Sequence, residues 1–241
     1  VVLNDNNVPD SIVDRAVQLK CEIKRIGIDY SFTVADGRLT WNPDPSRWGA
    51  ARTYSDLHIP GSGDDAVLHN TSGAIAIVES MDADLPVCKN AVREGLANTE
   101  LSGRTQALPG GIEQMFDVAH NPAAIANLAA FIDKRRPVRR NLAVFSMLKD
   151  KDLAEVVRLM GSRIASWHLT QLDGSRATPL QDLADVVSNH SNSDIKMWPN
   201  PLHAYKMAMQ LAHPGDRVVV FGSFYLVGAI LKSVSGHSLQ A

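Results

Sequence analysis

The 241-residue sequence lacks the features of several large protein classes. Its two cysteines, Cys21 and Cys88, are far apart and form no CxxC motif, so neither a disulfide framework nor a thiolate zinc site is expected. Lys and Arg number 24 against 26 Asp and Glu, so the clustered positive charge of a nucleic-acid binder is missing. No apolar run approaches the ~20 residues that cross a membrane. We therefore expect no nucleic-acid or membrane partner, and a reducing, cytoplasmic compartment.

Several catalytic motifs are missing as well. The sequence contains no GxSxG, no HExxH and no GxxxxGK[ST] phosphate-binding loop. Its histidines do not show a metal-ligand spacing, so we expect no metal ligands within the chain. His168, inside an apolar segment, is expected to be a packed core histidine. With 45% hydrophobic residues, the chain can bury a sizeable core and is not disordered.

The first hundred residues mix short strands with helices. The sequence begins with Val1, not Met, and we expect it to be a fragment that starts inside a domain; ordinary processing is the simpler alternative. A helix is expected over 9–20. An antiparallel meander follows, containing CEIKRIG and an Asp36-Gly37 turn, and then a loop over 42–48. The segments AVLHNTSGAIAIVESM and VCKNAVREGLANTEL predict two helices, the second with Pro86 in its first turn.

From Leu101 onward, short apolar segments alternate with helices. The expected strands are QMFDV, NLAVFSM, SWHLTQL, DIKMW and RVVVFGS, and the helices that follow them begin at Pro122, Lys151, Pro179, Pro201 and Phe224. This alternation predicts an α/β fold with a mostly parallel sheet covered by helices on both faces. We expect the domain boundary near 100–104, and we interpret the basic run KRRPVRR as a solvated surface loop.

The candidate site lies at the carboxyl ends of these strands, where open parallel sheets bind ligands. In DVAHNP, Asn121 and Pro122 favour a helix start, whose free N–H groups attract anions. Asp117 could accept a hydrogen bond from a ribose hydroxyl, and His120 could donate to a phosphate or carboxylate. Alternatively, Asp117 and Asn121 only cap the helix and His120 lies at the surface.

Two other segments point to the same edge of the sheet. In GSF, Ser223 caps the last helix beside an anion site, or simply ends a tight turn. Arg104 in SGRTQ forms a fork on phosphate oxygens, or a surface ion pair. We expect Asp117, His120, Ser146 and Ser223 to cluster at one edge of the sheet, within reach of one ligand.

Taken together, the segments SGRTQ, MFDVAHNPAA, AVFSMLKDKD and VVVFGSFYLVG resemble, in this order, the bacterial folylpolyglutamate synthase/dihydrofolate synthase family. That family is a branch of the Mur ligase superfamily. LHNTSGAIAIV is similar to a family helix, with Thr-Ser in place of Ala-Ala. The resemblance implies that 1–100 is the C-terminal part of the central, ATP-binding α/β P-loop domain. It implies that 101–241 is the C-terminal domain, Rossmann-like with a six-stranded sheet.

The resemblance also implies a reaction. A pteroate or folate carboxylate and ATP form an acyl phosphate, and the amine of L-glutamate attacks it to give an amide, ADP and phosphate. ATP and Mg²⁺ are the implied cofactors, with the magnesium ligands upstream of this chain, and the implied enzyme is a monomer. By motif, Asn70 contacts the adenine, Arg104 contacts the nucleotide phosphates, and Ser223 lies near the glutamate. Asp117 and His120 lie at the ribose and phosphates and orient the reacting groups.

The missing phosphate-binding loop is the main departure from that family. We therefore expect the chain by itself to be inactive. Two alternatives stay open: a non-catalytic nucleotide-binding module of the same fold, and a cell-wall Mur ligase. The residues do not separate dihydrofolate synthase from folylpolyglutamate synthase activity.

Overall fold

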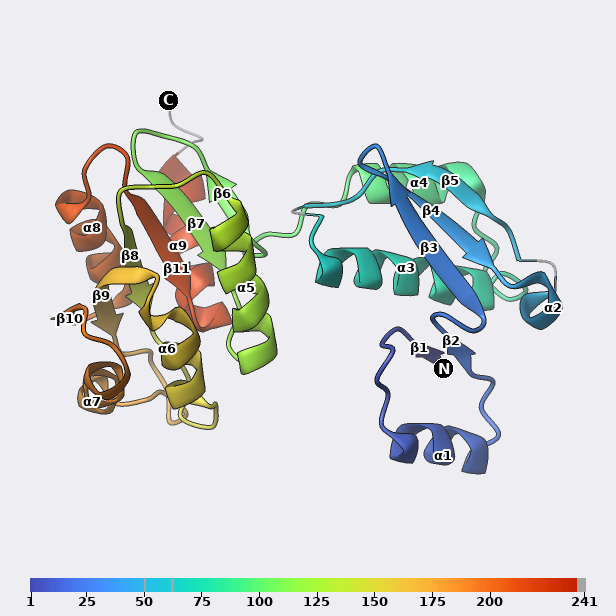
Figure 1. Ribbon diagram of the computed structural model, residues 1–241, viewed down its shortest axis with the longest axis horizontal. Helices are drawn as coiled ribbons and strands as arrows, with labels where there is room; N and C mark the ends of the chain where they lie inside the picture. The colour runs from blue at the N-terminus through green and yellow to red at the C-terminus, as the bar shows by residue number, and fades with distance from the viewer. Residues whose placement is uncertain (50, 62, 238–241) are drawn as a thin grey trace. The chain divides into compact units, whose positions relative to one another are not determined.

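The computed structural model of the protein describes residues 1–49, 51–61 and 63–237. The chain divides into two compact units, Val1–Leu101 and Ser102–Ala241, called here the first and second unit. Each has its own strands and helices (Figure 1) and its own buried hydrophobic side chains. Within the described ranges, every helix is too short or too polar to cross a membrane.

The first unit contains two small sheets. Its strands are β1 (Val2–Leu3), β2 (Lys24–Arg25), β3 (Tyr30–Ala35), β4 (Arg38–Pro43) and β5 (Tyr54–Leu57), and its helices are α1 (Asp10–Gln18), α2 (Pro45–Trp48), α3 (Asp65–Ser80) and α4 (Lys89–Ala97). β3, β4 and β5 form the antiparallel meander. Asp36 and Gly37 make the turn between β3 and β4 with φ angles of 52° and 71°, a conformation that suits Asp and Gly.

Three expectations for the first unit are wrong in detail. β2 does not join the meander; it pairs in parallel with β1, because α1 connects the two strands as a crossover. Pro86 precedes the fourth helix, which begins at Lys89 with Cys88 at its N-cap. The expected loop over 42–48 ends in α2, where the Asp44 side chain accepts a hydrogen bond from the N–H of Ser46.

Aromatic side chains fill the core of the first unit. Trp41 and Tyr54 are almost fully buried, and Ile75 of α3 packs in the same cluster. Gly73, two residues earlier in α3, lies against Asn4, since a Cβ there would be 2.8 Å from the Asn4 side chain. The glycine therefore lets α3 pack closely on the segment that follows β1.

The second unit is an α/β domain with one six-stranded sheet. Its strands are β6 (Gln106–Leu108), β7 (Glu113–Asp117), β8 (Asn141–Phe145), β9 (Ile164–Thr170), β10 (Asp194–Trp198) and β11 (Arg217–Phe221), and its helices are α5 (Pro122–Lys134), α6 (Leu153–Gly161), α7 (Leu180–His190), α8 (Pro201–Leu211) and α9 (Phe224–His237). The strand order is β10-β9-β8-β11-β7-β6, and only β6 pairs antiparallel. The predicted mostly parallel sheet is confirmed. The helix expected from Lys151 begins at Leu153, capped by Asp152.

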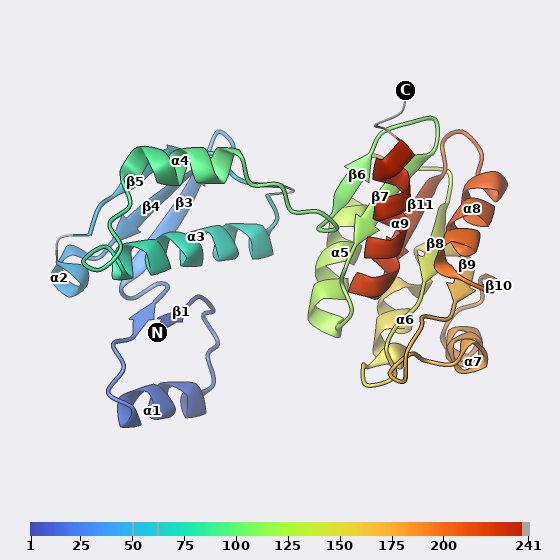
Figure 2. The same cartoon turned by 180° about the vertical axis from the view of Figure 1, so that it is seen from behind.

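Helices cover both faces of this sheet. α5, α6 and α7 contribute to one hydrophobic cluster, and α8 and α9 contribute to the other. Figures 1 and 2 show these two layers from opposite sides. The central strands β8 and β11 contribute apolar side chains to both clusters, as parallel strands buried in this way usually do. On one face the tilted rings of Phe145 and Phe221 pack with centroids 5.0 Å apart.

The basic run before β8 was expected to be a solvated surface loop, and this expectation is wrong. Its arginines belong to an ionic network. Arg139 and Arg140 both donate hydrogen bonds to the carboxylate of Asp216, which is 1% exposed. Burial alone would raise the pKa of Asp216, but these two donors outweigh it and hold the pKa well below its usual range. Arg217 and Glu113 form a neighbouring buried pair, 2.9 Å apart. The network joins the amino ends of β7, β8 and β11.

Candidate functional site

Three strands end together at the candidate site. Phe221, the last residue of β11, pairs with Asp117 of β7 on one side and with Phe145 of β8 on the other. The residues that follow these strands, His120, Ser146 and Ser223, therefore belong to the same edge of the sheet. β8 and β11 also mark the point where the chain order across the sheet reverses, which is where α/β sheets bind ligands.

The carboxylate of Asp117 connects two loops at this edge. It accepts hydrogen bonds from the backbone N–H of Thr105, at 2.8 Å, and of Ala119, at 2.7 Å. The N–H of Val118 donates to the carbonyl of Gly103, at 2.8 Å. The segments SGRTQ and DVAHNP thus form one interlocked structure. Asp117 is 6% exposed and does not line the cavity described next. In this structure its carboxylate accepts from backbone N–H groups, and its contact with a ribose stays a prediction.

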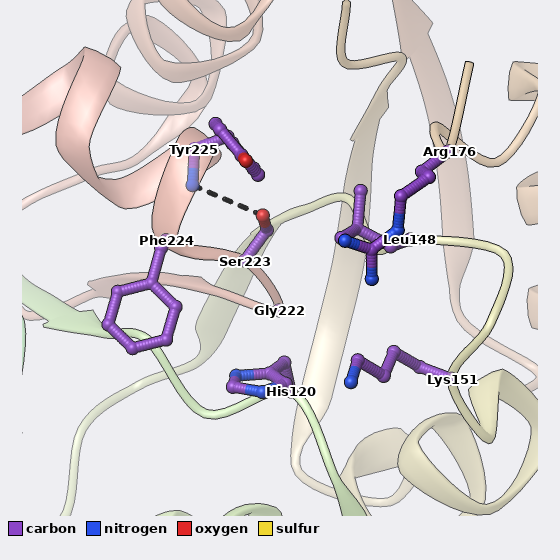
Figure 3. Close-up of a pocket in the computed structure, with 8 residues that line it drawn as sticks. All are labelled: His120, Leu148, Lys151, Arg176, Gly222, Ser223, Phe224 and Tyr225. Carbon is purple, nitrogen blue, oxygen red and sulfur yellow. Dashed lines mark hydrogen bonds between the residues drawn. The ribbon is translucent and has the colours of Figure 1, made fainter. Parts of the chain in front are cut away.

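A cavity of about 430 Å³ opens at the edge of the sheet. It is lined by His120, Leu148, Lys151, Arg176, Gly222, Ser223, Phe224 and Tyr225 (Figure 3). Two of these side chains, Lys151 and Arg176, carry positive charge, and none carries negative charge. A small anion fits such a lining.

Arg176 is held at the cavity by one carboxylate. Its guanidinium donates to both oxygens of Asp150, at 3.0 and 2.8 Å, and these bonds lower the pKa of Asp150. The ammonium of Lys151 lies 3.7 Å from the same carboxylate. Since two cations share one anion, the cluster keeps a net positive charge. The backbone supports it, because the N–H of Lys149 donates to the carbonyl of Arg176.

One ring nitrogen of His120 has a backbone partner, which fixes the tautomer of the neutral ring. Its Nδ1 lies 2.8 Å from the carbonyl oxygen of Val118. A carbonyl only accepts, so Nδ1 carries the proton, and in the neutral ring Nε2 is a hydrogen-bond acceptor. The ring packs against Phe224, with centroids 5.5 Å apart. The role predicted for His120, donation to an anion, therefore requires the protonated ring, whereas the neutral ring can accept a proton or a hydrogen bond.

The turn between β11 and α9 forms the cavity wall opposite Arg176 and Lys151. The Oγ of Ser223 accepts a hydrogen bond from the N–H of Tyr225, at 3.2 Å (Figure 3), as expected for a cap. Gly222 has a φ of +108°, and a Cβ there would lie 2.5 Å from the carbonyl oxygen of Ser146. Only glycine lets these two strand ends approach so closely.

The other residues expected at the site are distributed as follows. Ser146 is fully buried and, like Asp117, lies outside the cavity lining. Arg104 is exposed, and its guanidinium lies 5.7 Å from the ring of Phe224, so it borders the His120 side of the site. Asn70 lies on α3 of the first unit with an exposed side chain. Of the four residues expected to share one ligand, His120 and Ser223 line one cavity.

Sequence reasoning missed Lys151, Arg176 and Tyr225. The run KDKD after a strand was a usable signal for Lys151, although such runs are usually solvated. Arg176 gave no signal in the sequence, because it is the loop after β9 that brings it to the site.

No metal site is evident in the described ranges, which contain no group of three or more His, Cys, Asp or Glu side chains that could hold a metal ion.

Comparison with known proteins identifies the family. Residues 103–224 match the family model "Mur ligase, glutamate ligase domain". The chain is 27% identical to the dihydrofolate synthase/folylpolyglutamate synthase of Escherichia coli strain K12 over 98% of its own length and 52% of that protein. It thus spans about half the length of this curated relative.

Solved structures give the same result. E. coli FolC in complex with DHPP and ADP superposes with a TM-score of 0.81 at 26% identity, over 99% of this chain and 53% of that one. A bifunctional folylpolyglutamate synthase/dihydrofolate synthase with Mn, AMPPNP and L-glutamate bound gives 0.78 at 26% identity, over 97% of this chain and 53% of that one. With its family match over half of its length, the chain belongs to the Mur ligase family and carries that family's glutamate ligase domain.

Proposed function

We propose that the protein is part of an ATP-dependent ligase that adds L-glutamate to dihydropteroate, to folate polyglutamates, or to both. The observation that carries the proposal is the cationic cavity at the strand ends, within a matched glutamate ligase domain. The relatives' names support the folate branch over a cell-wall ligase.

The cavity suits an amino acid with two carboxylates. L-Glutamate carries two carboxylates, and Arg176 and Lys151 offer a forked donor and a point charge for them. Ser223 adds a hydroxyl next to the start of α9. The neutral His120 ring, with Nε2 as acceptor, is suited to receive a proton from the glutamate ammonium. Removing that proton exposes the lone pair that attacks an activated carboxyl group.

ATP and a divalent cation complete the proposed reaction. ATP supplies the phosphoryl group that activates the pteroate or folate carboxylate as an acyl phosphate. Because the described residues form no metal-ligand cluster, we assign no step of this chain to the Mg²⁺. Arg104, exposed beside Phe224, is proposed to contact the nucleotide phosphates, and Asn70 the adenine. Asp117 acts through the loops that it ties together.

The two units correspond, in this proposal, to parts of a longer ligase. The first is the C-terminal part of the central, ATP-binding domain, and the second is the C-terminal domain. Because the chain spans about half of its relative's length, we propose that it does not turn over alone. We further propose a cytoplasmic enzyme that acts as a monomer, with no nucleic-acid or membrane partner.

The test is ADP release. It is measured with ATP, Mg²⁺ and L-glutamate, using dihydropteroate and tetrahydrofolate as separate acceptors. Both the 241-residue chain and the product of the whole reading frame that contains it are assayed. Glutamate-dependent ADP release by the latter supports the ligase. ADP release that needs neither acceptor contradicts it and indicates ATP hydrolysis, and no release contradicts it in favour of a non-catalytic nucleotide-binding module.

A matched pair of variants tests the cavity itself. Arg176→Ala should raise the KM for glutamate roughly 10- to 100-fold, because a hydrogen-bonded charge is lost. Arg158→Ala is the control, since Arg158 is equally exposed and also pairs with one carboxylate, that of Glu155. His120→Ala should lower kcat. If Arg176→Ala leaves the KM for glutamate unchanged, glutamate does not bind in this cavity.

A further inference from the structure

A second cavity, of about 340 Å³, lies in the second unit on the face of the sheet that α8 covers. Ser166 and His168 of β9 line it, beside Asp194 and Lys196 of β10. The register pairs Asp194 with Ser166, and Lys196 with His168. Alternate residues of a strand share a face, so these four side chains leave the sheet on the same side.

Two polar groups in this cavity lack a protein partner. Ser166 is 7% exposed and His168 is fully buried. Within the described part of the chain, neither the Oγ of Ser166 nor the Nε2 of His168 has a hydrogen-bond partner. Buried polar groups are nearly always hydrogen-bonded, so each such group calls for an explanation. A ligand in the cavity would satisfy both.

The tautomer of His168 indicates the kind of ligand. The indole N–H of Trp198 donates to its Nδ1, at 3.1 Å. An indole nitrogen can only donate, so Nδ1 is the acceptor and the ring proton is on Nε2. Burial, with the Lys196 charge next to it, lowers the pKa of His168 to about 4, so the ring is neutral near pH 7. Nε2–H is therefore a fixed donor.

The charged side chains of the cavity also favour a ligand that accepts hydrogen bonds and carries negative charge. Lys196 and Arg140 both line the cavity, and Asp194 is its one carboxylate among the described residues. Asp194 pairs with Lys196, but its side chain is 61% exposed. It can therefore turn toward solvent and release the ammonium, while His168 and Ser166 stay in place on the strand.

We propose that this cavity binds a small oxyanion, the carboxylate or phosphate group of a metabolite. The Nε2–H of His168 and the hydroxyl of Ser166 donate to its oxygens, and Lys196 supplies the opposite charge. The apolar side chains of Leu142 and Leu211, which also line the cavity, accommodate the rest of a small molecule. The proposal does not depend on the proposed function, because it involves none of the residues at the strand carboxyl ends.

The experiment uses the Trp198 indole as a reporter in two-dimensional ¹H–¹⁵N NMR of the full chain. Sodium phosphate and sodium acetate are titrated in separate arms, with sodium chloride keeping the ionic strength constant. We expect a saturable shift of the Trp198 indole signal in at least one arm, and the arm that responds identifies the oxyanion. Long-range ¹⁵N spectra should show the Nε2–H tautomer of His168.

Matched variants decide whether the response comes from this cavity. Ser166→Ala, which removes a neutral donor, should weaken binding roughly fivefold. Lys196→Ala, which removes a charged donor, should weaken it roughly tenfold. Lys206→Ala, on the exposed side of α8, should leave it unchanged. Arg176→Ala should also leave it unchanged, since Arg176 lines the other cavity. The proposal is overturned by a shift that does not saturate, or by equal affinity in wild type, Ser166→Ala and Lys196→Ala.

Discussion

The backbone N–H of Thr105 donates a 2.8 Å hydrogen bond to the carboxylate of Asp117, twelve residues further along the chain. Thr105 adopts a φ of +44°, which is unusual for a β-branched residue. The bond therefore holds a strained turn in place beside the strand end that leads to His120. One carboxylate fixes both loops that approach the candidate site.

Replacing Asp117 should lower the stability of the second unit. Asp117→Ala removes the acceptor for two backbone N–H groups, one buried and one partly buried. It should lower the free energy of unfolding by about 2–4 kcal/mol, since both donors lose their partner. Asp117→Asn keeps one carbonyl oxygen and should recover part of that loss. Urea unfolding measures both. Equal stability of Asp117→Ala and wild type would contradict the positioning role.

Gly222 should not tolerate a side chain. Its φ of +108° and the 2.5 Å approach of a Cβ to the Ser146 carbonyl oxygen predict that Gly222→Ala destabilises the second unit by roughly 2–4 kcal/mol. Gly228→Ala on α9 is the control: a Cβ there meets open space, and Ala favours a helix by about 1 kcal/mol. Thermal unfolding of the two variants should move in opposite directions.

The buried His168 predicts an acid-sensitive stability. Its pKa of about 4 in the folded protein lies below the ordinary value of about 6.5. Between these values the unfolded chain binds a proton that the folded chain excludes, so stability falls as the pH drops from about 6.5 to about 4. The loss is on the order of 3 kcal/mol.

The variant His168→Gln lacks this titration. Its free energy of unfolding should depend less steeply on pH over the same window, and the difference between the two slopes isolates His168. Urea unfolding at intervals between pH 4 and pH 7.5 provides the measurement. If the free energy of unfolding depends on pH equally steeply in variant and wild type, His168 is protonated to the same extent in the folded and the unfolded chain.

The Asp216 cluster predicts a separate loss at lower pH. The folded-state pKa of Asp216 is depressed, so its stabilising effect is fully present above the unfolded value of about 3.9 and is lost below it. Asp216→Asn should therefore lower the free energy of unfolding at pH 7. Near pH 3, the free energies of unfolding of the variant and the wild type should differ by less. A constant difference at both pH values would contradict the ionic role.

The sheet was predictable from sequence because the strands from β7 onward are short, mostly apolar segments, and each is followed by a helix. Asn121-Pro122 is the clearest case, and the structure has the expected cap there. The same rule located the strand ends and hence His120 and Ser223. Local pattern was enough wherever the determining contacts lie within a few residues.

Long-range partners were not predictable in this way. The basic run before β8 was interpreted as a surface loop because its carboxylate, Asp216, lies 77 positions after Arg139. Arg176 reaches the cavity through Asp150, 26 residues earlier. The hydrogen-bonding state of His120 depends on the backbone conformation at Val118, which residue type does not reveal.

The position of β11 has a consequence for how the second unit is synthesised and folds. β11 is the last strand of the sheet along the chain, yet it lies between β7 and β8. Until it emerges from the ribosome, β6–β7 and β8–β9–β10 are two separate ribbons, each with an unpaired apolar edge. Such edges are prone to pair with other chains. The nascent chain therefore carries two aggregation-prone edges until residues 217–221 pair with both of them.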